Sequence, residues 1–294
     1  MRVLDEAAFI SQTEQAAREG WLYQLIDPTN AAERTLSLEE QKTAGLVKNR
    51  FLAQKPSERL YLYPAAKAGH SSAPNQFAAE VSKRSPSLLN PVPFCGWLVT
   101  QQARTRVASY LGRQLAQTTP DGSPALLRFY DPRVLEHLPR LLYPWQLSML
   151  LGPVDYWIFI DSARQVRCLE PHGDKRGLGR LKLTSEQWSG IRRIGQVNRC
   201  RELYRTLPGA DGIQAAQPHV VDALIVAANN LGISQQQDIA AFVLHGLTTH
   251  AAFYRHPRMQ TLFSRLGGRL SYVGLTNQLS DDEWAAISDN REDA

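Results

Sequence analysis

The residues of this sequence best suited to chemistry are two arginines and an aspartate at the end of a short apolar run. Arg128, Asp131 and Arg133 lie in the segment Arg-Phe-Tyr-Asp-Pro-Arg. Two guanidinium groups beside one carboxylate can form either a buried ion-pair cluster or an exposed patch that binds anions. Asp131 also has a purely structural role open to it, because Asp131-Pro132 is a typical helix start in which the carboxylate accepts hydrogen bonds from free backbone amides. We favour this capping role for Asp131.

Other acidic residues stand in similar positions. Asp27, Asp155 and Asp161 also lie near the ends of predicted strands. Groups for general acid and base catalysis often collect there, and so do aspartates that form turns. A hydrolase that used these carboxylates would need a divalent metal ion. Of three candidate functions we rank this one last.

Histidines and cysteines give no sign of a metal or redox site. His245, His250 and His256 are spaced by five and six residues, which places them on different sides of a helix. The sequence has neither a Gly-x-Ser-x-Gly nucleophile elbow nor a phosphate-binding loop. We therefore expect a protein that is not an enzyme, with no catalytic residues, no metal and no cofactor. The three cysteines are odd in number and widely spaced, which predicts no disulfide framework and suits a reducing cytoplasm: Cys95, Cys168 and Cys200.

Short apolar runs alternate with helical patterns in the first half of the chain. Asp121-Gly122 predicts a turn, and the strand after it leads directly into the helix at Asp131. A strand, a helix through Leu115 and a second strand in this order are typical of a parallel crossover unit. The predicted strands are 21–26, 59–63, 94–100, 125–130 and a hairpin of 156–160 with 166–169; the predicted helices are 3–18, 36–52, 103–115, one from 131 and 144–151, with a long loop over 65–91.

Strand patterns nearly vanish after residue 171. Residues 172–183 are rich in Gly, Lys and Arg and are predicted to form a flexible basic linker. We therefore predict an α+β fold, with a mixed α/β lobe of a sheet flanked by helices over 1–171, followed by an all-helical lobe over 184–294. Its helices are predicted at 186–207, 218–231, 235–254 and after Pro257, with capping boxes at Thr184 with Gln187, Ser234 with Gln237, and Ser280 with Glu283.

Charge is unevenly distributed along the chain. The formal net charge is +5, but residues 164–205 hold eleven Arg or Lys against four Asp or Glu, whereas the last fourteen residues hold six acids and one arginine. Such a basic region can bind nucleic acid or an acidic protein, and it can also be an ordinary solvated face. No apolar run reaches the roughly twenty residues of a membrane helix, and no signal peptide is apparent, so we expect no membrane insertion and a cytoplasmic location.

Aromatic residues suggest where a partner could bind. Most of the six tryptophans must belong to the core, but Trp, Tyr and Arg also dominate the energetics of protein interfaces. Trp284 is the strongest single candidate, because it lies in a short acidic segment after a predicted capping box.

Several segments of the sequence resemble the effector chaperones, or Tap-like adaptors, of the bacterial type VI secretion system. The specific part of the resemblance is the Arg128–Arg133 motif, in which Phe129, Asp131 and Pro132 form the structural core. The other segments that carry it are 22–27, 127–135, 150–154 with Gly152 and Pro153, Trp157, and 253–257.

The resemblance implies a non-catalytic loading factor in the cytoplasm. Such a protein binds a toxic effector and delivers it to the secreted valine-glycine repeat (VgrG) spike. The residues that would contact a partner are then Arg128, Tyr130, Arg133, Trp157 and Trp284. The alternative is a nucleic-acid-binding protein that uses the basic region 164–205, although this region carries no named motif. We expect nucleic acid to be the less suitable partner.

Overall fold

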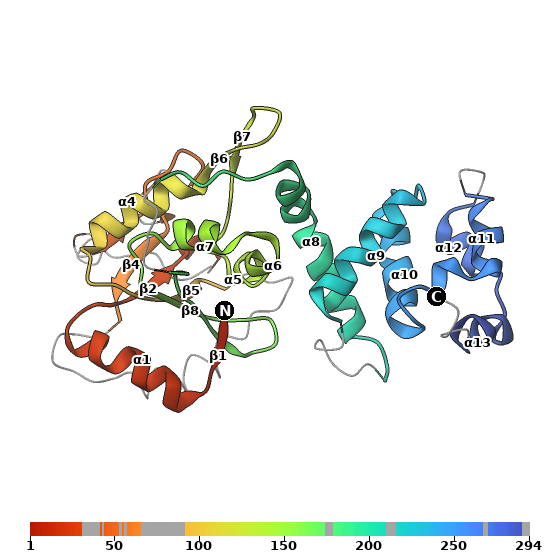
Figure 1. The fold of residues 1–294 in the computed structure, drawn as a ribbon, viewed down its shortest axis with the longest axis horizontal. Coiled ribbons are helices and arrows are strands. Elements are labelled where there is room, and N and C mark those ends of the chain that lie inside the picture. The colour runs from red at the N-terminus through yellow and green to blue at the C-terminus, as the bar shows by residue number, and fades with distance from the viewer. Residues whose placement is uncertain are drawn as a thin grey trace. The chain divides into compact units, whose positions relative to one another are not determined.

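The computed structural model describes residues 1–30, 42, 44–52, 55, 58–65, 92–173, 179–209, 216–266 and 270–289. The chain divides into two compact units, Met1–Arg192 and Arg193–Ala294. Unit 1 contains an antiparallel sheet with flanking helices and unit 2 is helical (Figure 1). The predicted α+β class is confirmed.

Within the described residues, the main sheet of unit 1 has seven strands, and every neighbouring pair is antiparallel. Its central strands β2, β5 and β8 come from distant parts of the sequence, so the sheet is built from long-range pairings. In spatial order the strands are β1 (Arg2–Leu4), β9 (Val166–Leu169), β8 (Tyr156–Ile160), β5 (Phe94–Val99), β2 (Leu22–Ile26), β4 (Tyr61–Pro64) and β3 (Gly45–Leu46).

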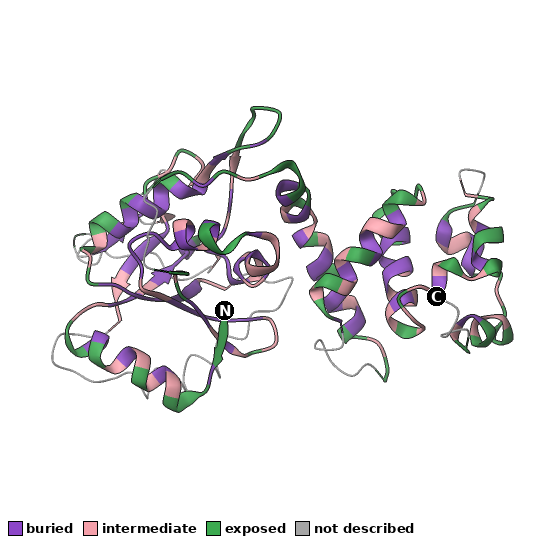
Figure 2. Cartoon of the chain, viewed as in Figure 1, coloured by how far each residue is buried: buried purple, intermediate pink, exposed green. Residues whose placement is uncertain are grey.

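Helices cover both faces of this sheet (Figures 1 and 2). Along β8, Trp157 and Phe159 belong to one hydrophobic cluster and Ile158 and Ile160 to the other, as the alternation of side chains along a strand requires. Helix α1 (Glu6–Arg18) packs on the Ile158 face. The Trp157 face is covered by α4 (Arg104–Leu115), α5 (Pro132–Leu135), α6 (Leu138–Leu141) and α7 (Pro144–Leu151).

A β-bulge lies between the two central strands. Leu25 pairs with Gly96 but Ile26 pairs with Phe94, so Cys95 is the extra residue. Gly96 has φ +137°, and a Cβ there would lie 2.6 Å from the carbonyl oxygen of Ile158. Only glycine fits at this position without displacing β8.

The predicted parallel crossover is wrong. Asp121-Gly122 does form a turn, but it closes a separate antiparallel hairpin of β6 (Ala116–Thr118) and β7 (Pro124–Leu126). β7 ends at Leu126, because Leu127 to Asp131 form a succession of tight turns. The sequence pattern identified the extended segment and placed it in the wrong sheet.

Unit 2 packs its helices around an aromatic core in which Phe242 contacts Phe253, Tyr254, Phe263 and Tyr272. Its elements are the latter part of α8 (Ser185–Arg205), α9 (Pro218–Asn230), α10 (Gln236–Thr248), the 3-10 turn η3 (Phe253–Arg255), α11 (Pro257–Phe263), α12 (Tyr272–Thr276) and α13 (Asp281–Asp289).

Two of the three predicted capping boxes are confirmed. The side chains of Gln187 and Glu283 each accept a hydrogen bond from the backbone N–H of the N-cap residue. The backbone N–H groups of Gln187 and Glu283 in turn donate to the hydroxyl of that residue, Thr184 or Ser280. The box at Ser234 is wrong, since the N-cap of α10 is Gln235 and makes no side-chain cap bond.

Three further expectations concern the parts of unit 1 that the structure describes incompletely. The helix over 36–52 is wrong over residues 44–52, where Gly45–Leu46 forms β3, whereas Lys42 is helical. The loop over 65–91 lies outside the described residues except for Ala65. Of the predicted linker, residues 174–178 lie outside them, while Leu181 is buried in the core of unit 1.

Candidate functional site

Asp131 is the N-cap of α5, as its sequence context predicts. Its Oδ1 accepts a bond from the backbone N–H of Arg133 at 3.0 Å. The same carboxylate accepts two bonds from the Arg133 guanidinium, from Nε at 3.0 Å and from Nη2 at 2.7 Å. Asp131 is 5% exposed, so cap and ion pair are both shielded from water.

Arg128 joins this pair to the end of β2. Its Nη2 lies 3.7 Å from a carboxylate oxygen of Asp131 and 3.7 Å from one of Asp27. Asp27 is itself buried and accepts bonds from Thr29 and Asn30. Two carboxylates therefore face two guanidiniums, and the charges balance within the protein. Of the two arrangements open to the sequence, the structure is nearer to the ion-pair cluster, in which both carboxylates are shielded while the Arg128 side chain is 42% exposed.

Burial and the two carboxylates determine the protonation of the neighbouring groups. Burial, reinforced by Asp27 and Asp131, raises the pKa of the Cys95 thiol well above its ordinary value. Burial likewise raises the pKa of Tyr130, again with a contribution from Asp27. Both groups are thus held neutral, and Cys95 lacks the thiolate character of a reactive cysteine.

The aromatic residues predicted to contact a partner lie in different environments. Trp157 is fully buried, stacks edge-on against Phe129 and donates its indole N–H to the Cys95 carbonyl. Tyr130 is 3% exposed and contributes one face to the Arg128 guanidinium. Trp284 is half-buried on the core of unit 2, with its ring 4.4 Å from that of His245. Trp157 and Tyr130 therefore present almost no surface in this structure.

Gly152 and Pro153 have structural roles. Gly152 ends α7 with φ +54°, and the ring of Tyr110 occupies the space that a Cβ would need. The Pro153 carbonyl accepts a bond from the Thr100 hydroxyl at 2.6 Å. Both residues fix α7 against α4 and the end of β5.

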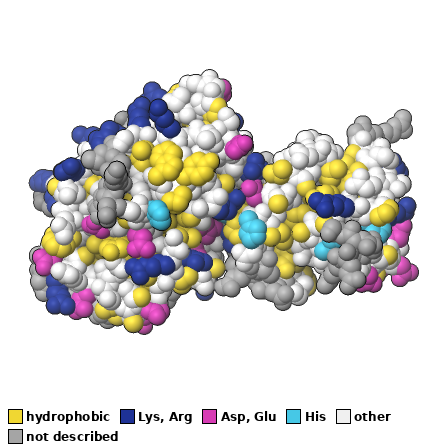
Figure 3. Space-filling view, viewed as in Figure 1, with side chains coloured by type: hydrophobic (Ala, Val, Ile, Leu, Met, Phe, Trp, Pro, Cys, Tyr) yellow, Lys and Arg dark blue, Asp and Glu magenta, His cyan; other side chains and the backbone are white. Residues whose placement is uncertain are grey.

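A second feature, which the sequence did not single out, is an exposed aromatic pair at the start of α7. Tyr143 and Trp145 are each 54% exposed, and their rings are nearly parallel with centroids 6.5 Å apart. The helix start is fixed because Gln146 accepts a bond from the Tyr143 N–H and donates one to the Lys182 carbonyl. In the view of Figure 3, hydrophobic side chains gather on part of the surface of unit 1. The signal available in sequence was Tyr143-Pro144-Trp145, two aromatics around a helix-starting proline.

Among the described residues of the basic region 164–205, several arginines are engaged within their own unit. Arg167 pairs with Asp161, Arg193 with Asp222 and Arg205 with Glu202. Arg201 is buried and donates to the Ala216 carbonyl. These arginines stabilise each unit internally, which leaves fewer charges for a nucleic-acid backbone.

Among the described residues, no group of three or more His, Cys, Asp or Glu side chains is placed to hold a metal ion. Within the same residues, none of the helices combines the length and the apolar character that a membrane crossing requires.

Fold and site thus define a two-unit α+β protein with an internally neutralised charge cluster and an exposed aromatic pair. Residues 22–149, less than half of the chain, match the family model described as a domain of unknown function (DUF4123). The matched range contains the ion-pair cluster and both exposed aromatics. No curated protein and no solved structure matches the chain.

Proposed function

We propose that this protein is a type VI secretion effector chaperone, an adaptor that binds a toxic effector in the cytoplasm and loads it onto the VgrG spike without catalysing a reaction. The match to the domain of unknown function covers two of the segments that carry the resemblance to these adaptors, 22–27 and 127–135, and ends before the others. The match itself assigns no activity, so the proposal depends on the surface of unit 1.

The observation that carries the proposal is the exposed pair of Tyr143 and Trp145. Rigid aromatic side chains bury a large area at a low cost in conformational entropy, and they are enriched among the residues that dominate binding energy. Here the pair is stacked and its helix start is held by Gln146. A surface of this kind is suited to a protein partner.

The test is recovery of partners by the tagged full-length chain from extract of its native cell, with a high-salt wash and mass spectrometry. The variant Tyr143→Ala/Trp145→Ala is compared with Val3→Ala, since Val3 is 52% exposed and also in unit 1. A central interface aromatic contributes about 2 kcal/mol or more, so the double variant should lose at least roughly 30-fold in affinity. Val3→Ala should retain binding.

Recovery of an effector or spike by the unmodified chain, lost in the double variant alone, supports the proposal. Recovery of nucleic acid that the wash removes would instead favour the electrostatic alternative. Equal recovery by both variants would remove the aromatic pair from the interface. Trp284→Ala and Arg128→Ala then test the two accessible residues that the resemblance implies.

A further inference from the structure

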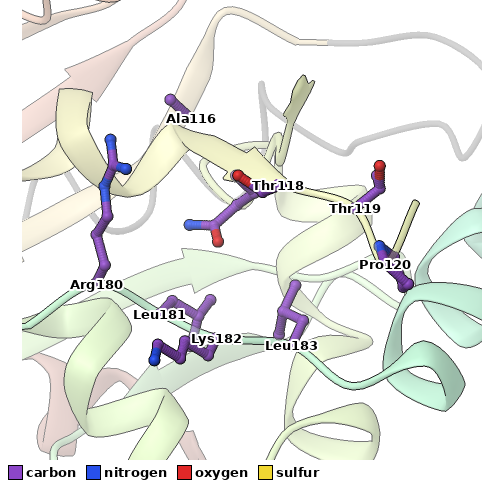
Figure 4. Close-up of a pocket in the computed structure, with 9 residues that line it drawn as sticks. Ala116, Thr118, Thr119, Pro120, Arg180, Leu181, Lys182 and Leu183 are labelled. Atoms are coloured by element: carbon purple, nitrogen blue, oxygen red, sulfur yellow. The ribbon is translucent and has the colours of Figure 1, made fainter. Parts of the chain in front are cut away.

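A slot lies between β6 and the segment 180–183 of unit 1. It has a volume of about 380 Å³, which is within the range of roughly 300–1,000 Å³ typical of ligand sites. Figure 4 shows β6 along one side and the 180–183 segment along the other. Its lining residues are Ala116 to Pro120 and Arg180 to Leu183.

One wall of the slot is a strand edge. Within the described residues β6 pairs with β7 alone, so the edge of β6 away from β7 has no neighbouring strand. An open edge presents backbone N–H and C=O groups that can pair with an added strand. The three residues of β6 offer roughly 10 Å of such an edge.

The other wall is held in place by glutamine side chains. Gln114 donates to the Gly179 carbonyl at 2.7 Å and accepts from the Leu181 N–H at 3.1 Å. Gln146 donates to the Lys182 carbonyl at 2.7 Å. Because the segment is anchored to α4 and α7 through these side chains, it runs beside β6 without joining its sheet.

The mouth of the slot is basic. Along the 180–183 segment, Arg180 and Lys182 are exposed, whereas Leu181 is buried and Leu183 half-buried. The adjoining hairpin turn carries one acidic group, Asp121, which accepts hydrogen bonds from Thr119 and Ser123 of the same turn. The Thr119 hydroxyl and the Ser123 backbone, together with the nearby Arg192, lower its pKa. Asp121 therefore stays ionised, and the two exposed cationic side chains of the 180–183 segment outnumber this one carboxylate beside the slot.

We infer that this slot binds a short, extended, acidic segment of a protein partner, which adds to β6 as a strand while its carboxylates face Arg180 and Lys182. The inference rests on the proposed function only for the origin of that segment, an effector or spike. The same Gln146 that anchors the slot also holds the start of α7, so the slot and the aromatic pair share one rigid support.

The test uses the full-length chain and a fluorescein-labelled peptide that alternates Glu with Val or Thr, measured by fluorescence anisotropy. A second peptide of the same sequence carries N-methyl groups on alternate amides, which keeps its charge and removes strand pairing. We expect binding of the first peptide, and a loss of about tenfold or more for Arg180→Glu/Lys182→Glu. Arg106→Glu, an exposed charge reversal in the first turn of α4, should leave binding unchanged.

The N-methylated peptide separates strand addition from simple charge attraction. If it binds as well as the unmodified peptide, or if neither binds, the inference is overturned. Failure of the proposed function has a different signature, since the peptide would still bind in the slot while no effector or spike co-purifies. If a partner co-purifies but the peptide does not bind, the inference about the slot is overturned and the proposed function is not.

Discussion

Asp131 is where cap and ion pair can be separated by experiment. Removing a helix N-cap costs about 1 kcal/mol. Asp131 also carries a bidentate pair with Arg133, whose side chain is 18% exposed, and hydrogen bonds to charged groups contribute roughly 1.5–3 kcal/mol. We therefore expect Asp131→Ala to lower the free energy of unfolding of unit 1 by about 3 kcal/mol.

Asp5 provides the matched control. It caps α1 by accepting a bond from the Ala8 N–H at 2.8 Å and is exposed, so Asp5→Ala should cost only about 1 kcal/mol. Asp131→Asn keeps an oxygen acceptor for the cap and removes the charge, and should fall between the two.

The assay is urea unfolding followed by tryptophan fluorescence. Five of the six tryptophans lie within Met1–Arg192, so the signal reports mainly on unit 1. The three variants should differ in midpoint and share one slope. If Asp131→Ala costs no more than Asp5→Ala, the Arg133 pair contributes nothing and the interpretation of this cluster as a stabilising network is wrong.

Two further predictions concern the bulge and the helical unit. Gly96→Ala should destabilise unit 1 by several kcal/mol, because its Cβ would overlap the Ile158 carbonyl. Gly20→Ala is the control, since Gly20 also has a positive φ but has open space around it, and this variant should cost only about 1 kcal/mol. Equal losses of stability in urea unfolding would contradict the steric argument. Burial lowers the pKa of His245 to about 4, from an ordinary value of 6.5. Because the imidazole of the unfolded chain is protonated at a higher pH than that of the folded chain, the free energy of unfolding of unit 2 should fall by up to about 3 kcal/mol between pH 6.5 and pH 4. Circular dichroism should record this loss, and His245→Gln should abolish it.

The elements that the sequence predicts well are those whose ends are marked by residues that start or stop a helix or a strand. Helix α7 begins at Pro144 and ends before Gly152, as its proline and glycine indicate, and the β8–β9 hairpin forms from the two predicted runs on either side of a polar turn. Pairing over long distances is different, because the residues of β5 do not reveal that its neighbours are β2 and β8. The crossover prediction failed for this reason.

Exposure of aromatic residues is the other property that the sequence conceals. Trp145 and Trp157 both have mainly apolar neighbours along the sequence, yet Trp145 is 54% exposed and Trp157 is fully buried. The difference arises because α7 packs its Leu150 side on the core, which turns its first residues toward solvent. The sequence likewise did not reveal the slot, since its two walls are at least sixty residues apart along the chain.

The most distinctive motif of this chain is therefore not its most available surface. In the Arg128–Arg133 segment, Phe129 is buried against Trp157 and Asp131 is satisfied by backbone and guanidinium donors. Polar groups that are paired within the protein gain little from a partner, because a new contact must first break the old one. The aromatic pair of α7 carries no such cost, since its rings already face solvent. Under the proposed function, a partner would thus contact the aromatic pair, whose helix start Gln146 holds in place, more readily than the motif.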